Sequence, residues 1–442
     1  MEVGGVRGGS SGVMLDHIKT PLFYFCVALV GILEGASKPH IVLFVSDDMG
    51  WNEVGFHGSK IDTPNINKLA KDGLQLDRFY VHPICSPTRA ALMTGRVPAR
   101  MGITGVVGRG GGVPKDEHFL PQTFHKEGYQ TFMVGKWHLG VAELGQTPNA
   151  RGFDYFFGFH GGGINYYSTE RLRARGWFRN DQSVAPQGYS TDILADEAIK
   201  LLKNRNKQKP VFLYLPFNAP HQPAQAPEQL LEKYRKLGFF GRRVEQAGAI
   251  EAMDAAIGRV LATIEAEGMT KETLVMFFCD NGSGGGRRRG STAQSGQLAL
   301  RGGKGQLLEG GIRVPAVVRW PGVIRAGAKC EQLVSAQDLL PTLSAAAGIR
   351  PGNQKPLDGV NCWPMLKENK EAKRKPVVVA GPFGGFAVLD GQWKLVWSNE
   401  GVSLFDLKKD PIEARDVAAD HPLTVATLAD ALVPFISKAK GD

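Results

Sequence analysis

The chain has 442 residues, of which 43% are apolar and 22% charged, a composition that excludes a disordered chain and suffices for a large core. Its net charge of +10 favours an anionic partner, although charge of this size could equally serve solubility alone. We expect no nucleic-acid partner, because the sequence has no basic amphipathic helix, zinc-finger spacing or aromatic–basic alternation. The five cysteines form no C-x-x-C pair, which excludes the usual zinc and redox motifs.

The first 36 residues have the pattern of a secretory signal peptide. His17 and Lys19 precede an apolar core from Pro21 to Leu33, and the small residues Gly35–Ala36–Ser37 follow it. Met14 is an alternative start. The apolar core is short for a stable membrane span, although an N-terminal anchor or a buried strand stays open. The pattern predicts a secreted or periplasmic protein.

Continuous apolar runs predict four strands that are buried on both faces, as in a mostly parallel sheet. They lie within residues 40–48, 129–140, 210–221 and 273–282. Helical patterns alternate with them at residues 64–74, 120–129, 190–204 and 248–268. Alternating strands and helices predict a doubly wound α/β fold, in which ligands gather at the carboxyl ends of the strands.

The chain changes character after about Ile349, and we place a domain boundary between residues 374 and 375. Residues 37–374 form the predicted main domain, and residues 375–442 a small α+β unit. In that unit, residues 386–397 predict a hairpin around Asp390–Gly391, "SLFDL" a third strand, and residues 424–439 a closing helix. Cys330 and Cys362 could pair, which the sequence leaves open.

Acidic and amide side chains follow two of the predicted strands. Asp47 and Asp48 end the first strand, and Asp280 and Asn281 end the last. Carboxylates that close together repel one another unless a cation lies between them, and oxygen ligands favour Ca²⁺ or Mg²⁺ over zinc. The alternative is that "DD" caps a turn and "DNG" is merely a tight turn.

Basic residues occur at the same predicted edge: Lys136, His138, His221 and Lys304. Lys136 and His138 are two residues apart, so they face the same side of an extended segment. Cations around a metal predict a multiply anionic substrate such as phosphate or sulfate, and histidine can protonate a leaving alkoxide. The alternative for a lone histidine is a structural hydrogen-bonding role.

The segment "CSPTR" places Cys85 at the start of a predicted helix, with Pro87 in its first turn and Arg89 one turn further along. A helix N-terminus and an arginine favour an anion there, so a thiolate nucleophile fits the position. However, sulfur is a poor ligand for a cation held by oxygen atoms. An oxygen group at residue 85 would remove this conflict.

"CSPTR" followed by "AALMTGR" resembles the signature of the type I sulfatase family. The similarity runs from about Pro39 into the C-terminal unit and includes "SDDMGWNEVGFHGS", "GKWHLG", "APH", "DNG" and "RGGKGQLLEGGIRVP". "GWNEVGFHGS" and "RGFDYFFG" look most like the arylsulfatase B, or N-acetylgalactosamine-4-sulfatase, branch. The resemblance implies an alkaline-phosphatase-like fold, with residues 37–374 as the catalytic domain.

In that family a separate formylglycine-generating enzyme oxidises the cysteine to formylglycine, whose hydrate is the nucleophile. The resemblance implies that residue 85 joins four Ca²⁺ ligands, with Mg²⁺ also possible: Asp47, Asp48, Asp280 and Asn281. It implies that Arg89 and Lys136 hold the nucleophile, and that His138 is the base which later releases sulfate. His221 and Lys304 are implied to bind the sulfate and protonate the leaving alcohol.

The implied activity is hydrolysis of a sulfate ester, with a sulfated carbohydrate or an aryl sulfate as substrate. Two alternatives stay open: a phosphate or phosphonate ester hydrolase of the same fold, and an inactive sugar-binding relative whose Cys85 is never converted. Residues 282–303 depart from the family pattern, and we interpret Arg287–Arg289 as a solvated loop tip. Tyr166 and Tyr167 are possible sugar-pocket residues, and Trp137 is expected to pack beneath the site.

Overall fold

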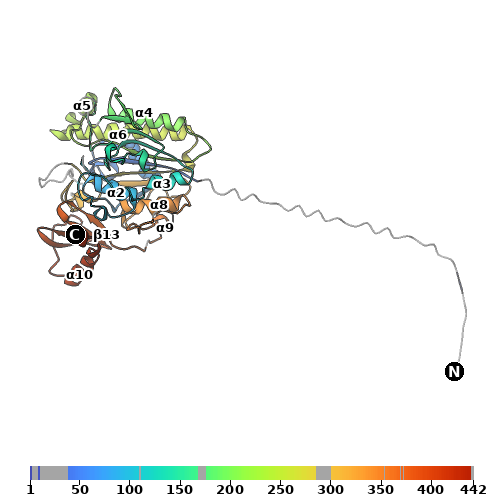
Figure 1. Ribbon diagram of the computed structural model, residues 1–442. Coiled ribbons are helices and arrows are strands. Elements are labelled where there is room, and N and C mark those ends of the chain that lie inside the picture. The colour runs from blue at the N-terminus through green and yellow to red at the C-terminus, as the bar shows by residue number, and fades with distance from the viewer. Residues whose placement is uncertain are drawn as a thin grey trace. The chain divides into compact units, whose positions relative to one another are not determined.

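The computed structural model in Figure 1 describes residues 38–108, 111–167, 176–284, 300–352, 354–368, 370–371 and 373–439, together with residues 1, 8 and 9. Internal contacts divide the chain into Met1–Ser37 and Lys38–Asp442, and the second unit is described below. The apolar core of the predicted signal peptide, Cys26 and the arginines at 287–289 lie outside the described residues. Within the described part, no helix combines the length and the apolarity needed to cross a membrane.

A ten-stranded sheet forms the centre of the fold, in the order β11-β2-β10-β9-β1-β8-β4-β5-β6-β7. Its middle strands are parallel: β9 (Thr273–Cys279), β1 (His40–Ser46), β8 (Val211–Pro216), β4 (Gln130–Lys136) and β5 (Tyr155–Phe159). Every residue of β1, β8 and β9 is buried, so the continuous apolar runs do mark strands covered on both faces.

Shorter strands extend the sheet on both sides: β2 (Leu74–Leu76), β10 (Ala316–Arg319), β11 (Ala328–Cys330), β6 (Trp177–Arg179) and β7 (Gln182–Val184). Strands β3 (Phe79–Tyr80) and β12 (Val334–Ser335) form a separate parallel pair. The antiparallel pairing of β10 with β9 and of β5 with β6 makes the sheet mixed but mostly parallel, as predicted.

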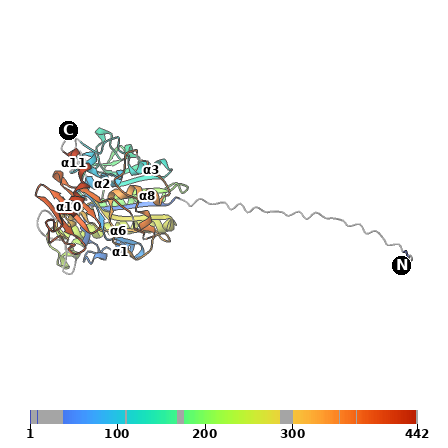
Figure 2. The same cartoon turned by 90° about the horizontal axis from the view of Figure 1, so that it is seen from below.

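Helices cover both faces of this sheet. One group packs on α6 (Arg242–Ala266) and comprises α1 (Pro64–Asp72), α4 (Ser190–Lys203) and α5 (Glu228–Lys236). The other group is α2 (Cys85–Thr94), α3 (Leu120–Lys126) and α8 (Leu339–Ala346), with α9 (Trp363–Glu368) against α8. Figures 1 and 2 show the two groups on opposite sides of the strands. The predicted α/β architecture is therefore confirmed.

The C-terminal region forms its own antiparallel sheet of four strands in chain order: β13 (Val377–Ala380), β14 (Phe386–Asp390), β15 (Trp393–Ser398) and β16 (Gly401–Asp406). The hairpin turn at Asp390–Gly391 is as predicted, and Gly391 adopts φ +54°, which suits glycine. The boundary at residue 375 stays a prediction. Cys330 and Cys362 are both buried and free, so they do not form the disulfide that the sequence left open.

The single closing helix predicted for residues 424–439 is wrong. Two helices occur there, α10 (Pro422–Asp430) and α11 (Val433–Ala439). Pro434 explains the break, because it has no N–H to donate to the carbonyl of Asp430 and its ring would clash with that carbonyl. Leu428, Leu432 and Phe435 from this helical segment cover one face of the C-terminal sheet.

The other face of the C-terminal sheet packs on the loop that carries Lys304. Leu307 and Ile312 share a buried cluster with Val377, Val379 and other residues of β13 and β14. Beside this cluster, the ammonium of Lys394 lies 3.0 Å from Glu309 and 2.7 Å from Glu413, and all three side chains are 0% exposed. The C-terminal sheet is thus joined to the Lys304 loop through apolar packing and a buried charge cluster.

Candidate active site

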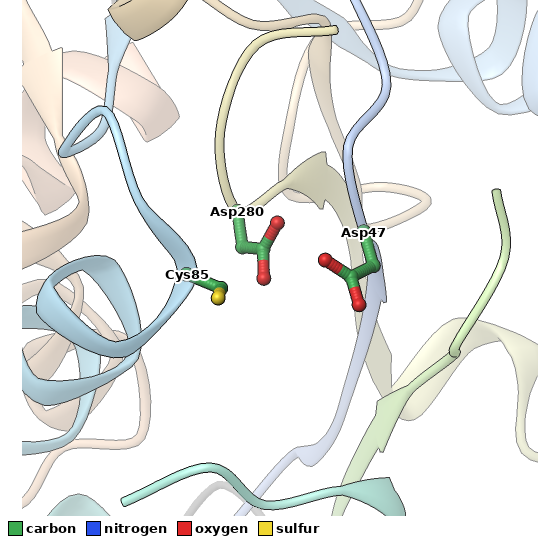
Figure 3. Close-up of side chains that lie close together, drawn as sticks. All are labelled: Asp47, Cys85 and Asp280. Atoms are coloured by element: carbon green, nitrogen blue, oxygen red, sulfur yellow. The ribbon is translucent and has the colours of Figure 1, made fainter. Parts of the chain in front are cut away.

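The carboxyl ends of the central strands bring the predicted residues together. Asp47 and Asp48 follow β1, Asp280 and Asn281 follow β9, and His138 lies just after β4, which ends at Lys136. Figure 3 shows the side chains of Asp47, Asp280 and Cys85 turned toward one another, with Cys85 on the first turn of the helix α2. Because parallel strands end at one edge of a sheet, residues far apart in sequence meet there.

The acidic residues have oxygen atoms without hydrogen-bond partners. Among the described residues, Oδ1 of Asp47, of Asp280 and of Asn281 is buried and accepts no hydrogen bond. Ligand atoms of Asp47, Cys85 and Asp280 all lie within 4.8 Å of one another. Buried polar oxygens of this kind need a partner, and a hard divalent cation is the partner that carboxylate and amide oxygens fit. The residues present therefore suit a calcium or magnesium ion.

Buried cations lie beside two of these carboxylates. Nζ of Lys136 is 2.6 Å from Asp47, and Arg89 donates from Nε and Nη2 to Oδ2 of Asp280 at 3.0 and 2.7 Å. Burial alone would raise the pKa of Asp47, but the charge of Lys136 holds it well below its usual range. Burial and the charge of Asp47 raise the pKa of Asp280 to about 6. Arg89 also donates to the carbonyl of Lys136 at 2.7 Å, which ties the two cations together.

Cys85 is 1% exposed and contacts a histidine. Its sulfur lies 3.2 Å from Nδ1 of His138, whose backbone has the uncommon φ of +59°. Burial raises the pKa of the Cys85 thiol, and burial with the charge of Lys136 lowers that of His138 well below its usual value. The thiolate nucleophile that the helix N-terminus suggested is therefore disfavoured at neutral pH.

The carboxylate of Asp48 contacts the remaining predicted residues. Its carboxylate is 2.6 Å from Nζ of Lys304 and 3.8 Å from Nε2 of His221, and it accepts a hydrogen bond from the Asn281 amide at 2.7 Å. Lys304 and His221 are partly exposed, at 24% and 23% of their side chains, so they can reach a ligand. The charge of Asp48 raises the pKa of Lys304 despite its burial, whereas burial lowers that of His221. All ten residues predicted for the site thus lie in one connected cluster.

A cavity of about 890 Å³ opens over this cluster. Its lining includes four predicted residues, namely Cys85, His138, His221 and Lys304. The sequence did not predict the rest of the wall, which includes Val106, Val107, Glu143, His160, Gly161–Asn165, Phe178 and Gln222. Apart from Phe178, which belongs to β6, these residues lie between the strands and α-helices in segments without a chemical motif, and only the run of three glycines marks a special backbone. His160 belongs to no motif in the sequence, yet it lines the cavity.

Two further expectations near the site have different outcomes. Trp137 is fully buried and donates from Nε1 to the carbonyl of Gln146 at 2.8 Å, as expected for a residue beneath the site. Neither tyrosine suggested for a sugar pocket is among the residues that line this cavity; Tyr167 is exposed, and its role there stays a prediction. Tyr166 is buried, and its hydroxyl donates to the backbone carbonyls of Asn218 and His221 at 3.2 and 3.1 Å. It therefore supports the segment that carries His221.

The serine beside Cys85 has a role that the sequence did not reveal. The hydroxyl of Ser86 donates to the backbone carbonyl of His138 at 3.0 Å and accepts from the backbone N–H of Val107 at 3.0 Å. This single side chain links the start of α2, the segment after β4 and the Val106–Val107 rim of the cavity. Such a link fixes the distance between residue 85 and His138.

Comparisons with known proteins agree with this geometry. The sulfatase family model matches residues 39–349, and a model described as the C-terminal region of N-sulphoglucosamine sulphohydrolase matches residues 303–433. Mouse arylsulfatase J is 30% identical over 91% of this chain and 76% of its own length. Mouse N-acetylgalactosamine-6-sulfatase is 32% identical over 84% of this chain and 75% of its own length.

Solved structures give the same result. A structure described as Ps i-CgsB in complex with k-i-k-neocarrahexaose matches with a TM-score of 0.83 and 34% identity, over 91% of this chain and 93% of that one. A phosphonate monoester hydrolase of Agrobacterium radiobacter is 20% identical with a TM-score of 0.64, which is a likeness of fold alone. With the family model covering most of its length, this chain belongs to the sulfatase family and is a sulfuric ester hydrolase.

Proposed function

We propose that the enzyme removes sulfate from a sulfated carbohydrate, of the N-acetylgalactosamine-4-sulfate type, with formylglycine at residue 85 and a calcium ion. One observation carries the proposal: the acidic and basic clusters converge on Cys85 at the floor of an 890 Å³ cavity. A cavity of this size accommodates one or two sugar rings. When present, the cation supplies charge stabilisation to the sulfuryl oxygens, and the hydrated aldehyde supplies a hydroxyl nucleophile.

The residues of the chain would hold the cation and supply positive charge beside residue 85. Asp47, Asp48, Asp280 and Asn281 hold the cation, and their three unpartnered oxygens support that assignment. Arg89 and Lys136 are each held by a carboxylate, so they supply fixed positive charge beside residue 85.

The partly exposed pair of His221 and Lys304 faces the cavity, where a sulfate group and its leaving oxygen would lie. These residues hold the sulfate and give a proton to the departing alcohol. His138, 3.2 Å from the Cys85 sulfur, is placed to accept a proton from a hydroxyl at residue 85.

Comparing the turnover of 4-nitrophenyl sulfate and 4-nitrophenyl phosphate tests the reaction class. We expect the sulfate to be preferred, because the family match is to sulfatases and the phosphonate hydrolase shares only the fold. A preference for phosphate would support the alternative ester hydrolase. Turnover of neither ester by protein from its native host, in which Cys85 stays unconverted, would support an inactive sugar-binding relative.

Peptide mass spectrometry of protein from its native host tests the modification. The Cys85 peptide should carry formylglycine, whereas the Cys279 peptide from the same digest should carry an unmodified thiol. Cys279 is a matched control because it is equally buried beside the same acidic cluster but lacks the C-x-P-x-R context. An unmodified thiol at both positions would contradict the proposal. The modification requires a formylglycine-generating enzyme as a transient partner, and the N-terminal pattern supports secretion or export to the periplasm.

The sulfate position is tested with a pair of N-acetylgalactosamine sulfates that differ only in carrying the sulfate on O4 or O6. The "GWNEVGFHGS" and "RGFDYFFG" segments support the 4-sulfate. One relative is named a 6-sulfatase, so the 6-sulfate is the competing substrate. A higher kcat/KM for the 6-sulfate would overturn the 4-sulfate assignment and leave the reaction class intact.

A further inference from the structure

The backbone of Gly162 lies against the imidazole of His138, and that of Gly163 lies against the imidazole of His221. A Cβ atom built on Gly162 would lie 2.7 Å from Cε1 and 2.8 Å from Nε2 of His138. A Cβ atom on Gly163 would lie 3.2 Å from Nδ1 and 3.4 Å from Cε1 of His221. Both glycines, together with Gly161, line the cavity. One stretch of bare backbone therefore forms a wall behind the two rings.

Closeness, rather than backbone conformation, explains why these residues are glycines. Neither Gly162 nor Gly163 is among the described glycines with positive φ, so alanine could adopt the same backbone angles. At Gly162, however, the 2.7 Å between the added Cβ atom and Cε1 of His138 is shorter than any normal contact between carbon atoms. Either the imidazole or the glycine segment would have to move. At Gly163 the contact is tight but within what a small shift can relieve.

Two hydrogen bonds hold the backbone of His138, so a clash with its imidazole has to be relieved by rotation of the ring. Its ring contacts the Cys85 sulfur, its N–H donates to the carbonyl of His160 at 3.1 Å, and its carbonyl accepts from Ser86. His221 is less confined, with 23% of its side chain exposed. A methyl group at position 162 should therefore displace the His138 imidazole from residue 85, whereas one at position 163 should tilt His221 slightly.

We propose that Gly162 and Gly163 are positioning residues, which set the imidazoles of His138 and His221 for two different proton transfers. The roles of the histidines rest on the proposed function. His221 would protonate the leaving alcohol, so its position matters most for a sugar alcohol, which is a poor leaving group, and least for 4-nitrophenol. His138 would act after the alcohol has left, so its position matters equally for every substrate.

The two alanine variants should therefore have different kinetic signatures. For Gly162→Ala we expect kcat to fall about tenfold or more with 4-nitrophenyl sulfate, with KM falling in parallel and kcat/KM nearly unchanged, because the slowed step follows alcohol release. For Gly163→Ala we expect kcat/KM to fall about threefold to tenfold with the sugar sulfate and less than about twofold with 4-nitrophenyl sulfate. General loss of structure would lower kcat/KM for both substrates in both variants.

A crystal structure gives a readout that does not depend on activity. In Gly162→Ala with unconverted Cys85, the distance from the Cys85 sulfur to Nδ1 of His138 should exceed the 3.2 Å of the parent chain. Gly105→Ala is the matched control: it has nothing within 4 Å of its added Cβ and a permissive φ, so both structure and kinetics should be unchanged.

An unmoved His138 ring in Gly162→Ala, or equal losses for both substrates in Gly163→Ala, would overturn the inference. Should Gly162→Ala fail to fold, the substrate dependence of Gly163→Ala decides on its own. Failure of the proposed function is recognisable separately, since the parent enzyme would then turn over neither sulfate.

Discussion

The buried charge of Lys394 offers a direct test of how the C-terminal sheet is attached to the loop that carries Lys304. The perturbation is Lys394→Met, which keeps most of the side-chain volume and removes the ammonium. Lys394 lies 3.0 Å from Glu309 and 2.7 Å from Glu413, and none of the three side chains is exposed. The variant would leave two buried carboxylates without their shared cation.

Removing one partner of a buried ion pair costs about 3–5 kcal/mol, because the remaining charge is uncompensated. Globular proteins unfold with an entropy of about 2.1 cal/mol/K per residue, so the unit of about 400 residues should lose about 4–6 °C in melting temperature. Burial already raises the pKa of Glu413, with Lys394 opposing the rise, so its pKa should climb further in the variant. Folding raises the pKa of this acid, so the acid lowers the free energy of unfolding only at pH values at which it is ionised in the unfolded chain. The destabilisation should therefore grow from pH 5 to pH 8.

Thermal unfolding followed by tryptophan fluorescence at pH 5 and pH 8 measures both effects. Lys409→Met is the matched control, since Lys409 is 83% exposed and lies 3.7 Å from Asp406, a contact worth little in water. The double variant Lys394→Met/Glu413→Gln should recover part of the lost melting temperature, because it removes one of the two buried, uncompensated carboxylates. A Lys394→Met variant as stable as the Lys409→Met control at pH 8 would refute the reasoning.

Three further predictions concern the site and its surroundings. Dialysis against a chelator should abolish sulfate ester hydrolysis, and added Ca²⁺ should restore it more fully than Mg²⁺; activity that survives chelation would contradict a cation-dependent site. Arg89→Lys should lower kcat/KM by about 100-fold, because lysine cannot reproduce the two hydrogen bonds to Asp280; a loss under threefold would refute this role. Burial lowers the pKa of His82 to about 4, so between pH 6.5 and pH 4 the unfolded chain binds a proton that the folded chain does not. The free energy of unfolding should therefore fall by about 3 kcal/mol over that range, and His82→Gln should remove most of this fall in denaturant titrations.

The sequence predicted which residues meet in the candidate site, because polar side chains that follow buried strands can be recognised from the sequence. Continuous apolar runs that stop at Asp47 and at Asp280 mark both a buried strand and the edge where its ligands lie. Cys85 begins α2 as expected, because a proline in the first helical turn is a local signal. Such signals depend on neighbours in the chain, which is why they could be read without the fold.

The walls of the cavity depend on contacts between distant segments, and local patterns do not encode them. His160 looks like an ordinary structural histidine until β5 and its neighbours place it at the cavity. The start of α6 was also missed, at Arg242 rather than Gly248, because its first turns carry charged residues that pack against other segments. The tyrosine at 166 failed as a pocket residue for the same reason, since only the fold shows that it points beneath His221.

The contact between His82 and the C-terminal sheet has a consequence for the biosynthesis of the enzyme. The backbone N–H of Ala380 donates to Nδ1 of His82 at 3.0 Å, so the segment leading to Cys85 is completed only after β13 has been made. Ala380 follows Cys85 by 295 residues, which ribosomes add in about 15–60 s at about 5–20 residues per second. During that interval the segment before Cys85 lacks this contact, and we expect Cys85 to be more accessible than in the finished fold, where it is 1% exposed. The proposed conversion of Cys85 is therefore in competition with folding, and slower translation should raise the fraction of converted enzyme.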